Sequence, residues 1–558
     1  MNLIRARFGK WPVVASALVL LVAAAVTASQ AQTVTTVFDF INSGGTATSP
    51  VGPMAQGRDG AYYGVTQGPS QGVIYKVSAT GSFTLLHAFA GDGSEGQSCN
   101  GLVLGTDGNF YGTCEMGGNN SNSTGTFFQV TPTGTLTVLH FFDGTFAGTV
   151  DGCYPLGVPV QASDGNFYGT TFECGVNDAG IIYQITPAGV FSVIHPFAFG
   201  SADGNQPEGA LIQGSDGNLW GTLSFGGANN GGAVFKSSLK GTESLVFSFG
   251  SCPATTTGCN PFAGLVQGTD GSYYGTAEQG GANNEGAAFK VTPRGTYTLL
   301  HSFNNLTDNG AYPRLPLAVG TDGNFYGIAT DCIGGGCSPA DLFEITSKSV
   351  FTDIFNFPVL GGNNNSVPLS PLLLSTTGTF YANTEDGGSG VGSFYSLTNG
   401  QSAFVGLQQT SAREGSKINI LGQGFTPSSL VKFGGVAATK VTVTGSTFIQ
   451  ATVPAGALTG KVTVTTGTTT LSSLITFKVA PQVKSFSPTS GPVGTPVTIT
   501  GTGLTQATAV KFNGTAATFT VNSDTQISTS VPTGATTGKI MVTTTGGTAS
   551  SSTSFTVN

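Results

Sequence analysis

The sequence predicts an all-β protein in which a seven-bladed β-propeller precedes two small β-sandwiches. Seven copies of one pattern run between residues 50 and 400, six centred on an Asp-Gly turn and a degenerate seventh with Thr377-Gly378, and each contains short apolar segments. A second pattern occurs twice after residue 401. Because a repeat of roughly 50 residues cannot bury its own apolar face, such copies stack on one another. The predicted parts are a signal (1–31), the propeller (32–401) and the sandwiches (402–479 and 480–558).

The chain opens with a predicted secretory signal. Three basic residues lie within the first ten positions, an apolar run covers residues 11–28, and Ser29-Gln30-Ala31 has the small-x-small form of a cleavage site. The run is close to the length that spans a membrane, so an uncleaved anchor is the alternative. With cleavage after Ala31, we expect a secreted, extracellular or cell-envelope protein that has no further contact with a membrane.

Composition narrows the classes of partner. Charged residues make up 9% of the chain and glycines number 85, but aromatic residues still reach 10%, which indicates a turn-rich fold rather than disorder. The net charge is −8 and basic residues are not clustered. Nucleic acid and anionic membrane surfaces are therefore not expected as partners.

Eight cysteines in a chain predicted to be exported favour disulfides over metal sites. Two pairs lie nearly symmetrically about an Asp-Gly turn, and two others would close short loops. No pair has zinc-site spacing, so no metal centre is predicted. The predicted disulfides are Cys99–Cys114, Cys153–Cys174, Cys252–Cys259 and Cys332–Cys337.

Each copy of the repeat reads as one four-stranded blade. In residues 101–142, an Asp-Gly turn joins the first two apolar segments and a Thr-Pro-x-Gly turn joins the last two, which is the chemistry of tight hairpins. A proline nine residues before the turn would start the first strand without losing a ladder hydrogen bond. It occurs in six copies, at Pro50, Pro155, Pro207, Pro261, Pro313 and Pro368.

Residues 33–40 predict how the ring of blades closes. This segment has the pattern of a fourth strand but precedes the first copy, whereas the seventh copy lacks its fourth strand. We expect 33–40 to supply the outer strand of the last blade, which leaves no open sheet edge between the first and last blades. Residues 402–407 are the alternative candidate for that place.

The two C-terminal copies have alternating short strands, as small β-sandwiches do. The segments SFSPTSGPVGTPVTITGTGL (485–504) and VPTGATTGKIMVTT (531–544) have counterparts in residues 402–479. Through these motifs both copies resemble the IPT/TIG family. The resemblance implies immunoglobulin-like sandwiches that serve as spacers or binding modules.

The propeller region resembles the GloVer-type choice-of-anchor tandem repeat family. The resemblance rests on G-x-DG-x-FYGT followed by GG and by VTP-x-G-x-x-x-x-LH-x-F, and it spans roughly 33–400. It supports the β-propeller-like repeat but implies no reaction.

Histidines and turn aspartates are interpreted as structural. All four histidines (His87, His140, His195 and His301) occupy one position of the fourth strand, where other copies carry phenylalanine. Fourth strands are outermost in propellers, so these rings would lie too far apart to share a metal. The aspartate before each turn glycine would bond nearby backbone N–H groups.

One pattern predicts a binding site. An acidic residue follows the turn by eight or nine positions in five copies, where the second-to-third loops emerge on one face of a propeller. Further acids and aromatic residues occur in the blade-to-blade loops on the same face, among them Asp92, Asp151, Asp203, Glu208, Asp308, Tyr154 and Tyr312. Such groups suit a glycan or Ca²⁺, although the acids could simply cap glycine-rich loops. The candidate ligand-binding residues are Glu115, Glu173, Glu278, Asp331 and Glu385.

The sequence favours a secreted or cell-surface protein that is not an enzyme. Catalytic motifs are absent, and no catalytic residue or obligatory cofactor is predicted. Expected partners are an extracellular polysaccharide or another surface protein. The alternative is a propeller carbohydrate-active enzyme, a lyase or glycosidase, which needs two carboxyl groups about 5–10 Å apart, one with a raised pKa. A purely architectural protein without a ligand is the third hypothesis.

Overall fold

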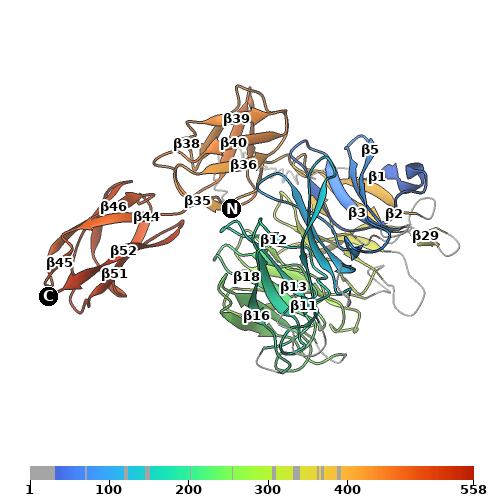
Figure 1. The fold of residues 1–558 in the computed structure, drawn as a ribbon, viewed down its shortest axis with the longest axis horizontal. Helices are drawn as coiled ribbons and strands as arrows, with labels where there is room; N and C mark the ends of the chain where they lie inside the picture. The colour runs from blue at the N-terminus through green and yellow to red at the C-terminus, as the bar shows by residue number, and fades with distance from the viewer. Residues whose placement is uncertain are drawn as a thin grey trace, which may run out of the picture.

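The computed structural model is almost entirely β-structure, with a ring of blades at residues 33–398 followed by two sandwiches (Figure 1). Among the described residues the single helix is the short 3-10 turn η1 (Phe40–Ser43), and no helix could cross a membrane. The structure describes residues 32–558 except 69–71, 119–122, 145–150, 201–202, 254–255, 305–309, 331–339, 358, 361–363, 366–367, 369 and 386–390.

Seven antiparallel sheets form the propeller, which confirms the predicted fold class. We number the blades 1 to 7 in the order of their Asp-Gly turns. Blade 1 contains β2 (Thr48–Gln56), β3 (Tyr62–Gly68), β4 (Val73–Val77) and β5 (Phe83–Ala88), and blade 2 contains β6 (Gln97–Cys99), β7 (Val103–Leu104), β8 (Phe110–Met116), β9 (Thr126–Val130) and β10 (Leu136–Phe141). Blade 3 contains β12 (Val160–Gln161), β13 (Phe167–Thr171), β15 (Ile181–Ile185) and β16 (Phe191–Pro196), and the small ladder of β11 (Gly152–Cys153) and β14 (Glu173–Cys174) lies beside it.

The remaining blades repeat this order. Blade 4 contains β17 (Ile212–Gln213), β18 (Leu219–Leu223), β19 (Ala233–Ser237) and β20 (Glu243–Ser248), and blade 5 contains β21 (Val266–Gln267), β22 (Tyr273–Ala277), β23 (Ala287–Val291) and β24 (Tyr297–Ser302). Blade 6 contains β25 (Ala318–Val319), β26 (Phe325–Ala329), β27 (Asp341–Ile345) and β28 (Phe351–Asn356). Blade 7 contains β31 (Leu373–Leu374), β32 (Phe380–Thr384) and β33 (Ser393–Thr398), and β29 (Val359–Leu360) and β30 (Asn364–Asn365) form a separate ladder.

Turn aspartates hold the start of blades 1 to 6, as predicted, whereas the turn of blade 7 has Thr377 before Gly378. In blade 2, one carboxylate oxygen of Asp107 accepts the Asn109 N–H at 3.1 Å and the other accepts the Tyr111 hydroxyl at 2.9 Å. The glycine between them, Gly108, has a φ of +99°, which a side chain would disfavour. The same arrangement recurs in the other Asp-Gly copies, so these aspartates serve the turn.

The ring closes through β1 (Thr33–Asp39). This strand pairs antiparallel with β33 from Thr33↔Thr398 to Asp39↔Ser393, so the first described strand completes the last blade. The pairing is the one expected from the pattern of residues 33–40. The alternative is wrong, because β34 (Gly406–Leu407) pairs with the first sandwich instead.

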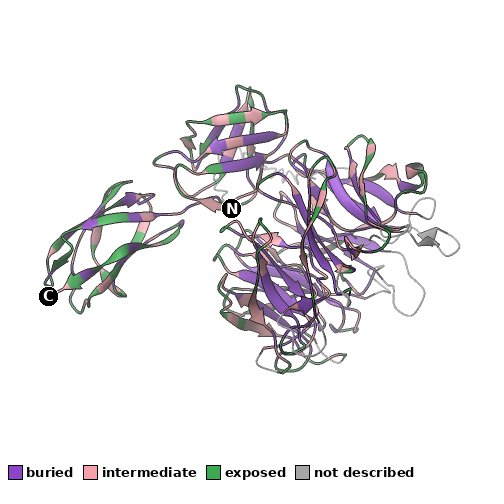
Figure 2. Cartoon of the chain, in the orientation of Figure 1, coloured by how far each residue is buried: buried purple, intermediate pink, exposed green. Residues whose placement is uncertain are grey.

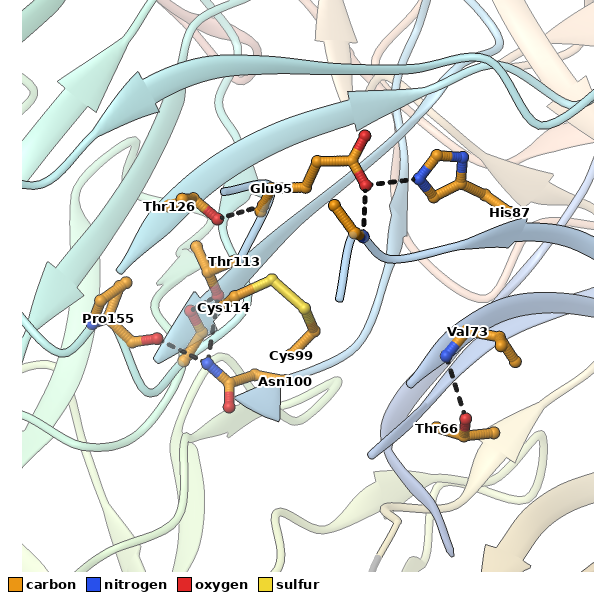
Figure 3. The surroundings of a disulfide bond; sticks show 12 residues. Thr66, Val73, His87, Glu95, Cys99, Asn100, Thr113, Cys114, Thr126 and Pro155 are labelled. Carbon is orange, nitrogen blue, oxygen red and sulfur yellow. Dashed lines mark hydrogen bonds and ion pairs between the residues drawn. A yellow bond between two sulfur atoms is a disulfide. The ribbon is translucent and has the colours of Figure 1, made fainter. Parts of the chain in front are cut away.

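Three of the four predicted disulfides are present: Cys99–Cys114, Cys153–Cys174 and Cys252–Cys259. The predicted Cys332–Cys337 pair lies outside the described residues. Figure 3 shows the first bond beside Asn100, whose side-chain amide donates to the Pro155 carbonyl of the next blade at 2.6 Å. Disulfides of this kind are typical of an extracellular or secreted protein.

The two sandwiches have matching sheet orders. The first contains β34, β35 (Ser411–Ala412), β36 (Lys417–Leu421), β37 (Leu430–Phe433), β38 (Val436–Ala437), β39 (Val441–Thr444), β40 (Phe448–Thr452), β41 (Val462–Thr466), β42 (Thr469–Ser472) and β43 (Lys478–Val479). The second contains β44 (Gln482–Ser487), β45 (Ser490–Gly491), β46 (Pro496–Thr502), β47 (Ala507–Phe512), β48 (Thr515–Ala517), β49 (Phe519–Ser523), β50 (Gln526–Ser530), β51 (Gly538–Thr544) and β52 (Gly547–Val557).

Burial divides the molecule into separate cores (Figure 2). Second and third strands of the blades are largely buried, while the outer fourth strands are half-exposed. Aromatic rings join neighbouring blades, as where Trp220 stacks on Tyr273 with centroids 3.8 Å apart. Each sandwich has its own apolar core between its two sheets.

Candidate functional site

The propeller has two unlike faces. Asp-Gly turns and third-to-fourth turns lie on one face, which we call the turn face, while the loops after second and fourth strands lie on the other, the loop face. The first sandwich contacts the turn face: Asn419 donates to the Thr106 carbonyl at 2.7 Å, and Thr447 donates to the Arg58 carbonyl at 2.6 Å. The guanidinium of Arg58 lies 4.4 Å from the centroid of Phe448.

A cavity of about 230 Å³ lies between the innermost strands of blades 2, 3 and 4, with Val103, Val160 and Leu211 in its wall. Gln408, which directly follows β34 of the first sandwich, also lines this cavity. Its side chain donates to the Gly105 carbonyl at 3.0 Å and accepts a bond from Arg58 at 3.3 Å. The sandwich thus covers part of the turn face around the centre of the ring.

The predicted acidic positions lie at loop-face ends of second strands but have different surroundings. Glu115 is half-buried at the end of β8, and burial raises its pKa. The Gln206 amide approaches Glu173 at 3.5 Å. Glu385 follows β32, and Asp331 lies outside the described residues. These side chains therefore do not form a ring of equivalent, solvated carboxylates.

Glu278 is the ring member with the most distinctive surroundings. Its carboxylate is 2% exposed and accepts hydrogen bonds from Arg314 through Nε, at 2.7 Å, and through Nη2. The Arg314 side chain is 52% exposed and its guanidinium lies 5.8 Å from the centroid of Phe262. A buried carboxylate therefore positions an accessible guanidinium beside an aromatic ring.

Blade packing places these groups on the loop face. Glu208, Phe262 and Arg314 each follow the recurring proline that leads into the innermost strand of blades 4, 5 and 6. Buried threonines of the preceding blades fix the adjacent backbone: Thr222 donates to the Ala263 carbonyl at 2.8 Å, and Thr276 donates to the Leu315 carbonyl at 3.2 Å.

Glu208 belongs to the same cluster, because Glu278 and Arg314 both influence its titration. Burial raises the pKa of Glu208 to about 7; the nearby Ser224 hydroxyl opposes the rise, the negative charge of Glu278 adds to it, and Arg314 opposes it. We call Glu208, Phe262, Glu278 and Arg314 the loop-face cluster.

We predict that Glu208 makes stability depend on pH. Since its folded-state pKa lies above the ordinary value of 4.5, its stabilising contribution is complete below 4.5 and is lost as the pH rises through about 7. Relative to Glu208→Gln, the wild-type free energy of unfolding should fall by about 1–3 kcal/mol between about pH 5 and about pH 8. Guanidinium unfolding followed by fluorescence of Trp220, the sole tryptophan in residues 32–558, measures this difference. Parallel pH profiles would contradict it.

The histidines lie on the outer strands, as predicted, and within the part of the chain that the structure describes His87, His140 and His195 each pair with a carboxylate from the loop that follows. The distance from the imidazole Nε2 to the nearest carboxylate oxygen is 2.8 Å for His87 and Glu95, 3.0 Å for His140 and Asp151, and 3.1 Å for His195 and Asp203. Figure 3 shows the His87–Glu95 pair, in which Glu95 also accepts the Ala90 N–H at 2.9 Å. Packing alone was predicted for these rings, so the carboxylate partners are an addition.

Sequence reasoning placed Glu208 and Glu278 on the loop face but missed Arg314 and Phe262. A signal existed: all but Glu278 occupy the position after a recurring proline, where the residue type varies from blade to blade. Variation at a fixed backbone position on one face of a repeat protein is typical of a binding surface.

Comparisons with known proteins support the division of the chain. Residues 100–340 and 155–395 match the Gloeobacter/Verrucomicrobia repeat, and residues 481–557 match the IPT/TIG domain. The IPT/TIG match covers the second sandwich alone, whereas the first shares its sheet order without a match. No curated protein matches the sequence.

Several solved structures resemble this chain at low identity. The oligogalacturonate lyase of Vibrio parahaemolyticus is 13% identical, with 65% of this chain and 93% of that chain covered and a TM-score of 0.41. The PQQ-bound aldose sugar dehydrogenase of Streptomyces coelicolor is 15% identical, with 66% and 99% covered and a TM-score of 0.35. With TM-scores below 0.5, neither structure carries an argument about this chain. The two repeat matches together span residues 100–395, more than half of the chain, and this protein therefore belongs to the Gloeobacter/Verrucomicrobia repeat family.

Proposed function

We propose that this protein is a secreted or cell-surface, non-enzymatic protein that binds an extracellular polysaccharide through the loop face of its propeller. The observation that carries the proposal is the loop-face cluster, in which the buried Glu278 holds the half-exposed Arg314 beside Phe262. A sugar ring can pack on the aromatic face while guanidinium N–H groups donate to its oxygens. The two sandwiches act as a spacer.

Two features of the scaffold support this choice of face. The first sandwich already contacts the turn face through Asn419 and Thr447, which leaves the loop face for a ligand. Three disulfides join loop-face segments of this chain to one another or to an adjacent strand, and they restrict the motion of the loops. A preorganised loop surface loses less conformational entropy when it binds.

The test is a glycan array probed with residues 32–558, with and without Ca²⁺. Phe262→Ala removes the ring, and the double variant Glu278→Gln/Arg314→Ala removes the guanidinium without leaving a buried charge. We expect each to weaken binding by at least about tenfold, as loss of a central contact does. Arg294→Ala is the matched control, since Arg294 is an exposed arginine on the turn face of blade 5.

The array also separates the competing functions. Unchanged binding by both loop-face variants would overturn the proposed site. No binding of the wild-type protein to any glycan would favour the architectural hypothesis.

The carbohydrate-active enzyme remains the second candidate because Glu208, with a pKa of about 7, shares the cluster with Glu278. However, Glu278 is buried and bonded to Arg314, which favours positioning over attack on a substrate. Incubation of each bound glycan with the protein, followed by measurement of new chain ends, decides between the two. Cleavage that Glu208→Gln abolishes would contradict the non-enzymatic proposal.

A further inference from the structure

The interface between blades 3 and 4 differs from its neighbours at the outer rim. At two other interfaces a phenylalanine of the next blade stacks on the histidine: Phe191 lies 4.0 Å from His140 and Phe351 lies 3.9 Å from His301, with nearly parallel rings. Between blades 4 and 5, Phe247 and Tyr297 stack in the same way at 4.5 Å. Ring stacking thus joins the outer strands across several blade boundaries.

Glu243 takes the place of that ring beside His195. It is the first residue of β20, and it pairs with Ser237 as Phe191, the first residue of β16, pairs with Ile185. A carboxylate therefore faces the His195–Asp203 pair where an aromatic ring would otherwise pack. Potential ligand atoms of His195, Asp203 and Glu243 all lie within 4.8 Å of one another.

The cluster contains more acceptors than donors. One Asp203 oxygen is 3.1 Å from His195 Nε2, and the other accepts the Ala198 N–H at 2.9 Å. Oε1 of Glu243 is fully enclosed and has no hydrogen-bond partner among the described residues. An enclosed carboxylate oxygen without a donor is costly, and a bound cation would remove that cost.

We propose that His195, Asp203 and Glu243 bind one divalent transition-metal ion, with Zn²⁺ the best match, and that this ion joins blade 3 to blade 4. One imidazole nitrogen and two carboxylates are ligands that Zn²⁺ takes, and three protein ligands leave a fourth position for water. The side chains of His195 and Asp203 are 20% and 22% exposed, so an ion can reach the site from solvent.

The outer strands of other blades hold histidine–carboxylate pairs with which the His195 cluster can be compared. His87–Glu95 and His140–Asp151 are two-residue pairs, and among the described residues only His195, Asp203 and Glu243 bring three potential ligands within reach of one ion. Glu115, Glu173 and Glu278 do not form such a group. The proposed ion would replace ring stacking as the link between outer strands, and it is independent of the glycan proposal.

The experiment is calorimetric titration of Zn²⁺ into the untagged, metal-stripped full chain. We expect one equivalent of Zn²⁺ per chain and a rise in Tm on saturation, since an ion that binds the folded state stabilises it. Glu243→Phe should abolish both effects and still fold, because the new ring can stack on His195 as Phe191 does on His140. His195→Phe, which copies Phe247 of the next blade, should do the same.

Glu95→Gln is the matched control, since it disrupts a histidine pair that lacks a third ligand, and it should leave Zn²⁺ uptake unchanged. Full uptake by both Glu243→Phe and His195→Phe would place the ion elsewhere and overturn the proposal. Absence of saturable uptake by the wild-type chain would also overturn it.

Discussion

Deletion of residues 32–39 should open the propeller and leave little soluble, folded protein. β1 supplies the outer strand of blade 7, and without it β33 presents an unpaired edge along its whole length. The same segment joins blade 7 to blade 1, since Phe38 stacks on Phe83 with centroids 4.8 Å apart. The deletion thus removes strand pairing and packing between the two ends of the ring.

The cost should approach the whole stability of a domain. Val34 and Phe38 are partly buried and pack against the buried clusters on either side of β1. A fully buried apolar side chain contributes about 1.5–3 kcal/mol, and each of these contributes part of that. With lost pairing, we expect a decrease of at least about 5 kcal/mol in the free energy of unfolding. Thermal unfolding and size-exclusion chromatography measure it, and exposed β33 edges should pair between chains.

Thr35→Ala is the matched control, because Thr35 lies in the same strand with an exposed side chain and should tolerate the change. A synthetic peptide of residues 32–43 should restore folding in part by adding a strand to the open edge. A deletion variant with wild-type Tm would show that the ring does not depend on this closure.

Local chemistry explains why the fold could be predicted from sequence. In five of the seven copies the aspartate, glycine and tyrosine of the turn lie within five residues of one another, so residues such as Asp107, Gly108 and Tyr111 predict a blade start without tertiary information. Cys99 and Cys114 flank that turn almost symmetrically, so the pairing of the hairpin strands brings the two cysteines together. Strand β1 was predictable because residues 33–40 have the sequence pattern of a fourth strand of the repeat.

The candidate site depends on contacts between blades, which a single copy of the repeat does not reveal. Glu278 belongs to the pattern of the acidic ring, yet its counter-ion is Arg314, 36 residues later at the start of the next blade. Glu243 likewise faces His195 across a blade boundary. Alignment of the copies shows that Glu243 occupies the position of Phe191, but its meaning depends on knowing which rings stack.

Arg314→Ala should cost far more stability than Glu278→Gln, although the two residues form one ion pair. The Glu278 side chain is 2% exposed and that of Arg314 is 52% exposed. Loss of the arginine leaves a buried carboxylate without its counter-ion, whereas loss of the carboxylate's charge leaves an arginine that water can solvate. We expect a decrease of about 2–4 kcal/mol in the free energy of unfolding for Arg314→Ala and about 1 kcal/mol for Glu278→Gln.

The double variant Glu278→Gln/Arg314→Ala should recover most of the stability that Arg314→Ala loses, because it no longer buries a charge. Guanidinium unfolding of the four proteins forms a double-mutant cycle, and Arg294→Ala on the turn face supplies the reference for a solvated arginine. Equal costs for the two single variants, or no recovery in the double variant, would contradict a buried carboxylate at this position. The single variants should differ in stability as stated, and the double variant should fold but no longer bind the glycan. That result would show that Arg314 is needed for glycan binding but not for folding once the charge of Glu278 is removed.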